Sequence, residues 1–158
     1  MTNRLRYVSA SPEGYARLGD FGHYLNTKTT LSPVLKAMID LRVSQINHCE
    51  YCMQLHADEM RKHNEPETRI AAVEDFRNTD AFTPREKAAL AWAETLTLLP
   101  ESHRATEEEY AAISEFFQGK DLADLTYVIA AINAWNRIGV AFRPQYRGLP
   151  SKSEPSVH

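Results

Sequence analysis

The sequence predicts an all-α fold, a helical bundle in a single domain. Helix-start signals recur along the 158 residues, while strand signals are nearly absent. Only 6 glycines occur, and none of them forms an Asn-Gly or Asp-Gly hairpin signal. Hydrophobic residues make up 43% of the chain, which supplies a core and excludes disorder over most of the length. A chain of this length fits one domain.

Hydroxyl residues followed by proline mark three of the expected helix starts. The hydroxyl can accept a hydrogen bond from a free N–H of the first turn, where proline loses nothing. Two further pairs have the spacing of a capping box. The first group is Ser11-Pro12, Ser32-Pro33 and Thr83-Pro84, and the capping pairs are Thr83 with Glu86 and Thr106 with Glu109.

Seven helices follow from these starts and from the spacing of apolar residues. Pro100 and Pro144 mark stops, and Gly119 can adopt the left-handed conformation that ends a helix. The expected ranges are 12–25, 33–46, 49–63, 66–76, 84–99, 107–117 and 122–142. The residues expected to face the core are Val34, Leu35, Met38, Ile39, Ala88, Ala89, Trp92, Leu96, Leu99, Leu125, Val128, Ile129 and Ile132.

The last expected helix is nearly apolar from Leu122 to Ala134. Such a helix needs burial on most sides, either inside the bundle or against another subunit, so an oligomer is expected. We assign residues 1–146 to the helical domain and the polar residues 147–158 to a tail that is either frayed or used in assembly.

Charge and hydropathy exclude several classes of function. The net charge of -3 argues against a protein that binds nucleic acid through phosphates, which would need a basic face. No apolar run approaches the length needed to span a bilayer, and no apolar stretch of signal-peptide length follows Arg4 and Arg6. We therefore expect a cytoplasmic protein that contacts neither membrane nor nucleic acid.

The only two cysteines, Cys49 and Cys52, are followed by His56. On a helix these separations of three, four and seven residues keep the three side chains on one face. The cysteines fall in the first turn, where free N–H groups and the helix dipole stabilise a thiolate. His56 can take a proton from Cys52 directly or from Cys49 through a water. The motif thus supplies an activated thiolate, a second thiol and a base.

Reduction of a hydroperoxide needs those same parts. A thiolate attacks the O–O bond and becomes a sulfenic acid, the leaving alkoxide takes a proton, and the second thiol condenses with the sulfenic acid to a disulfide. An external dithiol must then reduce that disulfide. The dipole favours Cys49 as the attacking sulfur, whereas the spacing to His56 favours Cys52, so the assignment stays open.

Other interpretations of the cysteine pair remain. The pair could be buried packing, or half of a zinc site completed by His56 with His48 or His63, although three ligands from one helix face fit a tetrahedron poorly. Covalent haem attachment is excluded because Met53 follows Cys52. A thioredoxin fold would need strands beside the motif. His48 could lower the pKa of Cys49 or be a solvated turn residue, and Tyr51 is expected to point away from this face and to pack.

Several motifs resemble the alkylhydroperoxidase AhpD-like proteins of the carboxymuconolactone decarboxylase superfamily. The main one is Leu-Arg-Val-Ser-Gln-Ile-Asn at residues 41–47, which runs into the cysteines and His56. The others lie at residues 82–92 and 132–137, so that the resemblance covers about residues 31–143. It implies an all-helical fold that forms trimers or hexamers and a thiol-dependent peroxidase with Cys49 and Cys52 as the redox pair and His56 in the proton relay.

The resemblance also implies the partners, and of the chain's two departures from the family pattern one lies between the cysteines, where Glu50 and Tyr51 replace the histidine of some members, and the other concerns the proton relay. A lipoylated adaptor or similar dithiol would return the electrons, and no haem, flavin or metal would be needed. The family commonly carries a relay glutamate twelve residues before the first cysteine, where this chain has Ala37. A methyl group cannot carry a proton. The substitutes that the sequence offers are Glu50, Glu86, Glu94 and Asp40, and Glu86 competes as a capping-box residue.

We therefore expect a thiol-dependent peroxidase with an antioxidant role that reduces alkyl hydroperoxides. The alternatives are a thiol–disulfide oxidoreductase or redox sensor without peroxide turnover, a decarboxylase of the wider superfamily, and a helical assembly without enzymatic activity. Decarboxylase members typically lack the cysteine pair, which weighs against that alternative.

Overall fold

The computed structural model describes residues 4–149, and within this range every regular element is a helix, as predicted. The elements are α1 Tyr7–Ala10, α2 Pro12–Thr27, α3 Pro33–Ile46, α4 Glu50–Lys62, α5 Glu67–Ala72, the 3₁₀ helix η1 Val73–Asn78, α6 Pro84–Thr97, α7 Leu99–Ser102, α8 Glu107–Ser114 and α9 Gly119–Phe142. Most of the expected tail, residues 150–158, lies outside the described residues.

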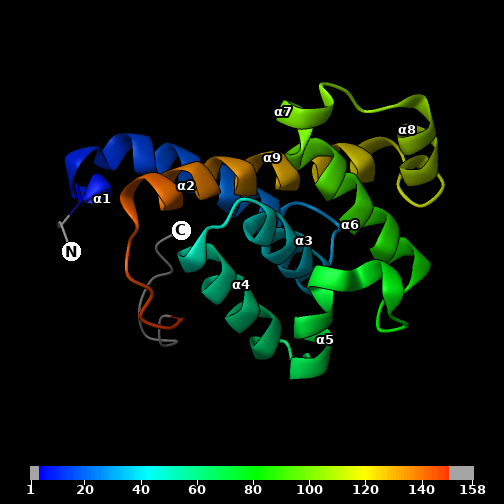
Figure 1. Ribbon diagram of the computed structural model, residues 1–158. Coiled ribbons are helices and arrows are strands. Elements are labelled where there is room, and N and C mark those ends of the chain that lie inside the picture. The colour runs from blue at the N-terminus through cyan, green and yellow to red at the C-terminus, as the bar shows by residue number, and fades with distance from the viewer. Residues whose placement is uncertain (1–3, 150–158) are drawn as a thin grey trace.

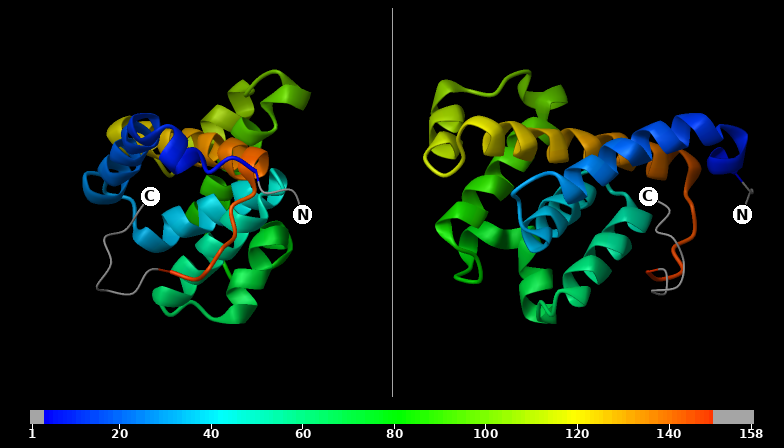
Figure 2. Two further views of the ribbon diagram at one scale, coloured as in Figure 1. Left: turned by 90° about the vertical axis from the view of Figure 1, so that its left-hand side faces the viewer. Right: turned by 180° about the vertical axis from the view of Figure 1, so that it is seen from behind.

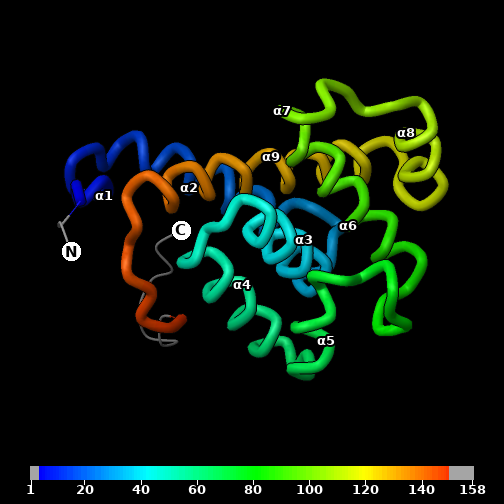
Figure 3. The backbone as a smooth tube through the Cα atoms, viewed as in Figure 1, coloured from blue at the N-terminus to red at the C-terminus, as the bar shows by residue number. Residues whose placement is uncertain are grey.

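Helix α3 is the central element and packs against α4, α6 and α9. Helices α2 and α9 run side by side across the top of the molecule in Figure 1, and the reverse view in Figure 2 shows the same pair. After α9 the chain turns down and runs beside α4, as the tube in Figure 3 shows. There Tyr146 donates a hydrogen bond to Asp58 of α4 (2.7 Å). The space between α2, α3, α4 and α9 is where the candidate site lies.

The helix starts confirm most of the predicted caps. The hydroxyl of Ser32 accepts from the N–H of Leu35 (3.1 Å), and both predicted capping boxes, at Thr83 and Thr106, are present. The prediction for Ser11 is wrong, because its side chain makes no capping hydrogen bond to α2. Proline at the first turn is sufficient to start that helix without a side-chain cap.

The helix boundaries depart from the sequence prediction most clearly in three places. The expected helix 66–76 is divided into α5 and η1, because Asp75 has a non-helical backbone (φ −118°, ψ 41°). The chain leaves α6 at Thr97, and Pro100 then lies in the first turn of the short α7 instead of ending a longer helix. Gly119 has the left-handed φ that was predicted (+51°), but it stands at the first residue of α9.

The core lies along both sides of α3 and confirms the predicted inward face of α9. Met38 and Ile39 of α3 are fully buried, and so are Leu90 of α6 and Leu125 of α9. Each such side chain contributes about 1.5–3 kcal/mol through removal from water. Leu99 was expected inside and is 37% exposed, because α6 ends before it. Within the described range, no helix is both long enough and apolar enough to cross a membrane.

Candidate functional site

The turn between α3 and α4 places the first cysteine. The N–H of Cys49 donates to the carbonyl of Ser44 (3.0 Å), and the N–H of His48 donates to that of Gln45 (3.2 Å). This pattern is a Schellman motif, in which one residue takes the left-handed conformation. His48 is that residue (φ +52°), and its side chain is exposed. The geometry therefore supports the interpretation of His48 as a solvated turn residue.

Cys49 ends this turn and begins the next helix. It is the N-cap of α4, and its Sγ accepts a hydrogen bond from the N–H of Cys52 (3.4 Å). Cys49 and Cys52 form a disulfide across a Cα–Cα distance of 5.2 Å. Both are buried, with 1% and 4% of their surface exposed. The predicted position of the pair in the first turn is confirmed, and its sulfurs are able to join.

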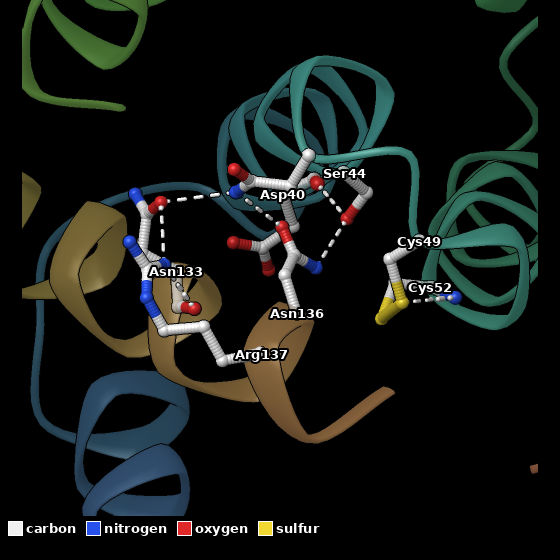
Figure 4. The surroundings of a disulfide bond; sticks show 8 residues. Asp40, Ser44, Cys49, Cys52, Asn133, Asn136 and Arg137 are labelled. Atoms are coloured by element: carbon white, nitrogen blue, oxygen red, sulfur yellow. Dashed lines mark hydrogen bonds between the residues drawn. A yellow bond between two sulfur atoms is a disulfide. The ribbon is translucent and has the colours of Figure 1, made fainter. Parts of the chain in front are cut away.

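A set of polar side chains fixes this turn against α9 (Figure 4). Asn47 donates to the side-chain oxygens of Asn133 and Asn136, both at 3.0 Å. Asn136, itself buried, donates to the hydroxyl of Ser44 (3.0 Å), which donates to the carbonyl of Asp40 (2.6 Å). Buried polar groups that are fully bonded hold one geometry. Sequence reasoning missed this network, although two asparagines in a nearly apolar helix were a signal for it.

Gly139 of α9 packs directly against the two sulfurs of the disulfide. A Cβ at this position would lie 2.5 Å from Sγ of Cys49 and 3.1 Å from Sγ of Cys52. Real Cβ atoms do not approach a sulfur so closely, so a residue with a side chain would push the sulfurs or the helix away. The absence of a side chain at Gly139 thus allows α9 to pack directly on the bonded sulfurs.

His56 lies one turn beyond Cys52 and faces two carboxylates. Its Nδ1 is 2.7 Å from Oε2 of Glu59 and 3.8 Å from Oδ2 of Asp40. His56 is 8% exposed, whereas the two acids keep part of their surface accessible. At 2.7 Å a protonated Nδ1 donates to Glu59, which fixes the orientation of the ring. Asp40 comes from α3, so this contact joins the two helices.

The charges of this cluster shift one another's protonation. Burial raises the pKa of Asp40 to about 7, with Glu59 adding to the increase while His56 and Lys36 oppose it. Burial acts to lower the pKa of His56, but Asp40 and Glu59 together outweigh it, and the pKa of His56 is raised. The pKa of Asp40 is therefore moved towards neutral pH and that of His56 is moved upwards, which makes the pair a candidate for proton transfer.

A cavity of about 340 Å³ opens beside the cluster. Its charged side is formed by α3 and α4, which contribute Lys36, Asp40, His56 and Glu59. Its apolar side comes mainly from α2 and α9. Cys52 lines this cavity, whereas Cys49 is not among its lining residues. The second sulfur, the histidine and both acids thus share one space.

The other acids proposed from the sequence lie elsewhere. Glu86 closes its capping box and binds Arg69 (2.6 Å), and Glu94 forms ion pairs with Arg42 and Arg77. Glu50 is exposed in the first turn of α4. None of these three glutamates lines the cavity, whereas Asp40 does. Of these four acids, Asp40 is the one that contacts His56 across the α3–α4 interface. Spacing along the chain could not distinguish them.

Tyr51 was expected to point away from the motif, and this is wrong. It lines the cavity, and its ring packs edge-on against that of Tyr146 (5.5 Å between centroids, 84°). The expected direction of Tyr51 was based on its position around α4 alone. The segment after α9 and the N-terminal helices pack on the same side of α4 as Tyr51 and close the cavity there. Tyr51 therefore does pack, but at the cavity rather than away from it.

Among residues 4–149, one group of side chains has donor atoms close enough for a metal ion. The nitrogen or oxygen donors of Asp40, His56 and Glu59 lie within 4.8 Å of one another. Hydrogen bonding between protonated partners accounts for the same distances. The zinc interpretation needs Cys49 and Cys52 as thiolate ligands. Their sulfurs are bonded to each other, so neither is available as a thiolate ligand in this structure.

Known proteins resemble this chain over most of its length. The uncharacterized protein YdfG of Bacillus subtilis is 35% identical over 89% of this chain and 95% of its own length. The crystal structure of ATU0492 from Agrobacterium tumefaciens, described as a protein of unknown function and a candidate antioxidant defence protein AhpD, superposes with a TM-score of 0.87. Its identity is 30%, over 92% of this chain and 99% of that one.

A more distant structure shares the fold. The debrominase Bmp8, solved in complex with 2,3,4-tribromopyrrole, has a TM-score of 0.79 at 18% identity, over 89% of this chain and 74% of its own. The model of the carboxymuconolactone decarboxylase family matches residues 12–95. With the AhpD-like fold and the disulfide at the start of α4, these findings identify the chain as an AhpD-like member of the carboxymuconolactone decarboxylase family.

Proposed function

We propose that this protein is a thiol-dependent peroxidase that reduces organic hydroperoxides through the Cys49–Cys52 pair. The observation that supports this best is the shared cavity, which brings Cys52, His56 and Asp40 to one space while the neighbouring sulfur is already in disulfide contact. An enzyme of this kind needs a sulfur that meets the peroxide, a proton donor beside it and a second sulfur within bonding distance.

Cys52 is the attacking sulfur in this proposal. Its thiolate attacks the terminal oxygen of R–OOH, the O–O bond breaks, and Cys52 becomes a sulfenic acid while RO⁻ leaves. The attacking sulfur must face the substrate, and Cys52 lines the cavity while Cys49 does not. From the sequence alone, the helix dipole favoured Cys49 and the spacing to His56 favoured Cys52. The position of the cavity favours Cys52.

Cys49 resolves the intermediate. Its thiolate, stabilised by the N–H of Cys52 at the start of α4, attacks the sulfenic sulfur, and hydroxide leaves to become water on protonation. An external dithiol then reduces the disulfide by exchange. Because both sulfurs are almost fully buried, a small dithiol on a flexible arm, such as a lipoyl group, fits this step better than a bulky protein surface.

His56 and Asp40 move the protons. Glu59 holds Nδ1 of His56, so the neutral ring has its lone pair on Nε2, where it accepts the proton of the attacking thiol. The alkoxide takes a proton back from the His56–Asp40 pair. Asp40 thus performs the task that Ala37 cannot, from one turn further along the same helix. A pKa near 7 suits a group that must both give and take a proton.

We further propose that the protein is a cytoplasmic homo-oligomer, a trimer or hexamer as the family resemblance implies. Large apolar side chains on the outside of α2 and α9, among them Tyr24 and Tyr127, support an assembly. Sedimentation of the purified chain would measure its size.

Serine variants of the two cysteines test the reaction and the order of attack. With dihydrolipoamide as reductant, Cys49→Ser and Cys52→Ser should each lose all turnover of cumene hydroperoxide. In single-turnover experiments, a dimedone adduct should form on Cys52 in the Cys49→Ser protein, and none should form in Cys52→Ser. Normal turnover in either variant would contradict the peroxidase, and an adduct on Cys49 alone would reverse the order of attack.

A further inference from the structure

The cavity beside Cys52 has an apolar body. Leu25 of α2 and Val128, Ile132 and Trp135 of α9 line it opposite the charged helices. Its volume of about 340 Å³ falls in the range of small-ligand sites, about 300–1,000 Å³. An apolar wall of this kind binds the hydrocarbon part of an organic molecule, and hydrogen peroxide alone would leave most of it unused.

Lys36 is a buried cation in the wall of this cavity. It is 6% exposed, and its Nζ donates to the carbonyl of Leu25 (2.9 Å). An ammonium carries three N–H donors, and between residues 4 and 149 the Leu25 carbonyl is its only hydrogen-bond acceptor. No carboxylate of the described residues lies within 4.0 Å of Nζ. The remaining N–H groups of Lys36 can donate to an acceptor that enters the cavity.

The charges around Lys36 leave room for an anion. Two lysines, Lys36 and Lys62, and two acids, Asp40 and Glu59, line the cavity, so their formal charges cancel. Asp40 is partly protonated at neutral pH, because burial raises its pKa to about 7, and His56 adds positive charge whenever it takes up a proton. Burial lowers the pKa of Lys36 while Asp40 and Glu59 oppose this shift, so an incoming anion meets a cavity whose formal charges balance.

Lys36 and Cys52 lie on opposite sides of the Asp40–His56 contact. A short turn joins the end of α3 to the start of α4. Lys36, one turn before Asp40, therefore lies further from this turn than Asp40, whereas Cys52, one turn before His56, lies nearer to it than His56. The two helices pack against each other, and residues one turn apart share a face, so the four side chains follow one another along the helix interface. A molecule held by its anionic end at Lys36 would extend past this contact towards the sulfur.

We propose that the cavity binds an organic carboxylate, with the carboxylate bonded to Nζ of Lys36 and the apolar body against α9. This inference rests on the proposed function, and it names the substrate as an organic hydroperoxide that carries a carboxylate at the end opposite the peroxide. Lys36 is the residue that sets this preference, and it takes no part in the reaction at sulfur.

Binding to the oxidised protein tests the site without any turnover. We would titrate para-isopropylbenzoate, and in parallel its amide, into the full chain in its disulfide form and follow the heat of binding. The two probes share shape and differ in charge, so the carboxylate should bind at least about tenfold more tightly. Lys36→Met should remove this preference while leaving the affinity for the amide unchanged.

Lys62→Met is the matched control, because Lys62 lines the same cavity but is exposed. A charge in water is screened, so this variant should retain most of the preference. Equal affinity of the unaltered chain for acid and amide would overturn the proposal, even if Lys36→Met failed to fold. An equal loss of preference in both lysine variants would overturn the role of Lys36.

Turnover separates this inference from the peroxidase itself. Cumene hydroperoxide with a para-carboxylate should be reduced with a kcat/KM at least about tenfold above that of cumene hydroperoxide. Selective carboxylate binding without any peroxide consumption would support the binding site and contradict the proposed function. Peroxide consumption with no preference for the acid in binding or in turnover would do the reverse.

Discussion

Acidic side chains on the two sides of α4 have pKa values that are shifted in opposite directions. On the cavity side, burial raises the pKa of Asp40 to about 7. On the outer side, a hydrogen bond from Tyr146 lowers the pKa of Asp58, and Arg61 lowers it further. Asp58 meets donors that stabilise its charge, whereas the nearest partner of Asp40 is His56, 3.8 Å away. The same residue type thus has a lowered pKa on one side and a raised pKa on the other, and only the raised pKa suits the proton relay proposed above.

The same division separates the glutamates that the sequence offered as relay groups. Glu86 and Glu94 are bonded to arginines, whose guanidinium groups fix the position of the two carboxylates. Glu59 faces a histidine. A carboxylate that is held by arginine contributes to the packing of helices, while one that faces histidine can take part in proton transfer. The partner, more than the residue itself, decides the role.

Among the variants that test this difference between carboxylates that face histidine and carboxylates bonded to arginine, we expect the largest effect from the loss of His56. His56→Ala removes the base and proton donor, so dithiol-dependent peroxide reduction should fall by about 100-fold or more, the usual contribution of general acid–base catalysis. The pH–rate profile should lose its dependence near neutral pH. Stopped-flow measurement of thiol oxidation between about pH 5 and pH 9 would give both results.

Two variants serve as controls for His56→Ala. His63→Ala changes a second histidine that lines the same cavity but is exposed at the end of α4, and it should leave turnover nearly unchanged. Glu86→Gln weakens the contact with Arg69 and should reduce stability by about 1 kcal/mol without slowing the reaction of the folded protein. A loss of turnover in Glu86→Gln comparable to that in His56→Ala would contradict the division by partner.

The second effect concerns the packing of α9 on the disulfide. In Gly139→Ala the new Cβ would meet Sγ of Cys49 at 2.5 Å, so closing the disulfide should require the helix to shift. The reduced protein has more freedom, because its sulfurs need not approach each other. We expect disulfide formation after peroxide attack to slow by about tenfold, which corresponds to about 1.4 kcal/mol.

Mass spectrometry of quenched samples would show this as a longer-lived sulfenic acid on Cys52. The matched control is Gly22→Ala, because Gly22 also lines the cavity and a Cβ there would meet no atom within 4 Å. Unchanged disulfide formation in Gly139→Ala would mean that the close contact imposes no constraint on the cycle.

Local spacing predicted a large part of this molecule. The range 33–46 of α3 and the capping boxes at Thr83 and Thr106 were predicted correctly, because proline and side-chain caps act within one turn. Cys52 and His56, four residues apart on α4, line the same cavity as their spacing predicts, whereas Cys49 precedes the helix as its N-cap. The short helices α1 and α7 were missed, since four residues give too little periodicity to detect.

Contacts between helices could not be predicted in the same way. The choice of Asp40 among four acids depends on how α4 packs on α3, and the cavity depends on α2 and α9, which are far away in the sequence. Tyr51 was misplaced for this reason, and Lys36 was not considered at all. Sequence spacing gives the face of each helix, whereas the partner of a face is decided by the packing of the whole bundle.

The smallest effect, and the most direct test of the comparison, is the pH dependence of stability in two asparagine variants. The folded pKa of Asp40 is above its ordinary value of 3.8, so its ionisation opposes folding as the pH rises through about 7. Asp40→Asn should therefore raise the free energy of unfolding by about 1 kcal/mol at about pH 8 and have little effect near pH 4.

Asp58→Asn should behave with the opposite sign. The folded pKa of Asp58 is below its ordinary value of 3.8, so its contribution is present at neutral pH and is lost as the pH falls through the folded pKa. The variant should be less stable by about 0.5–1 kcal/mol at neutral pH, and this difference should disappear in acid. Urea unfolding followed by circular dichroism at several pH values would measure both variants. Two stability differences of the same sign at about pH 8 would show that Asp40 is a fixed charge like Asp58, and the proton relay would then have to use another group.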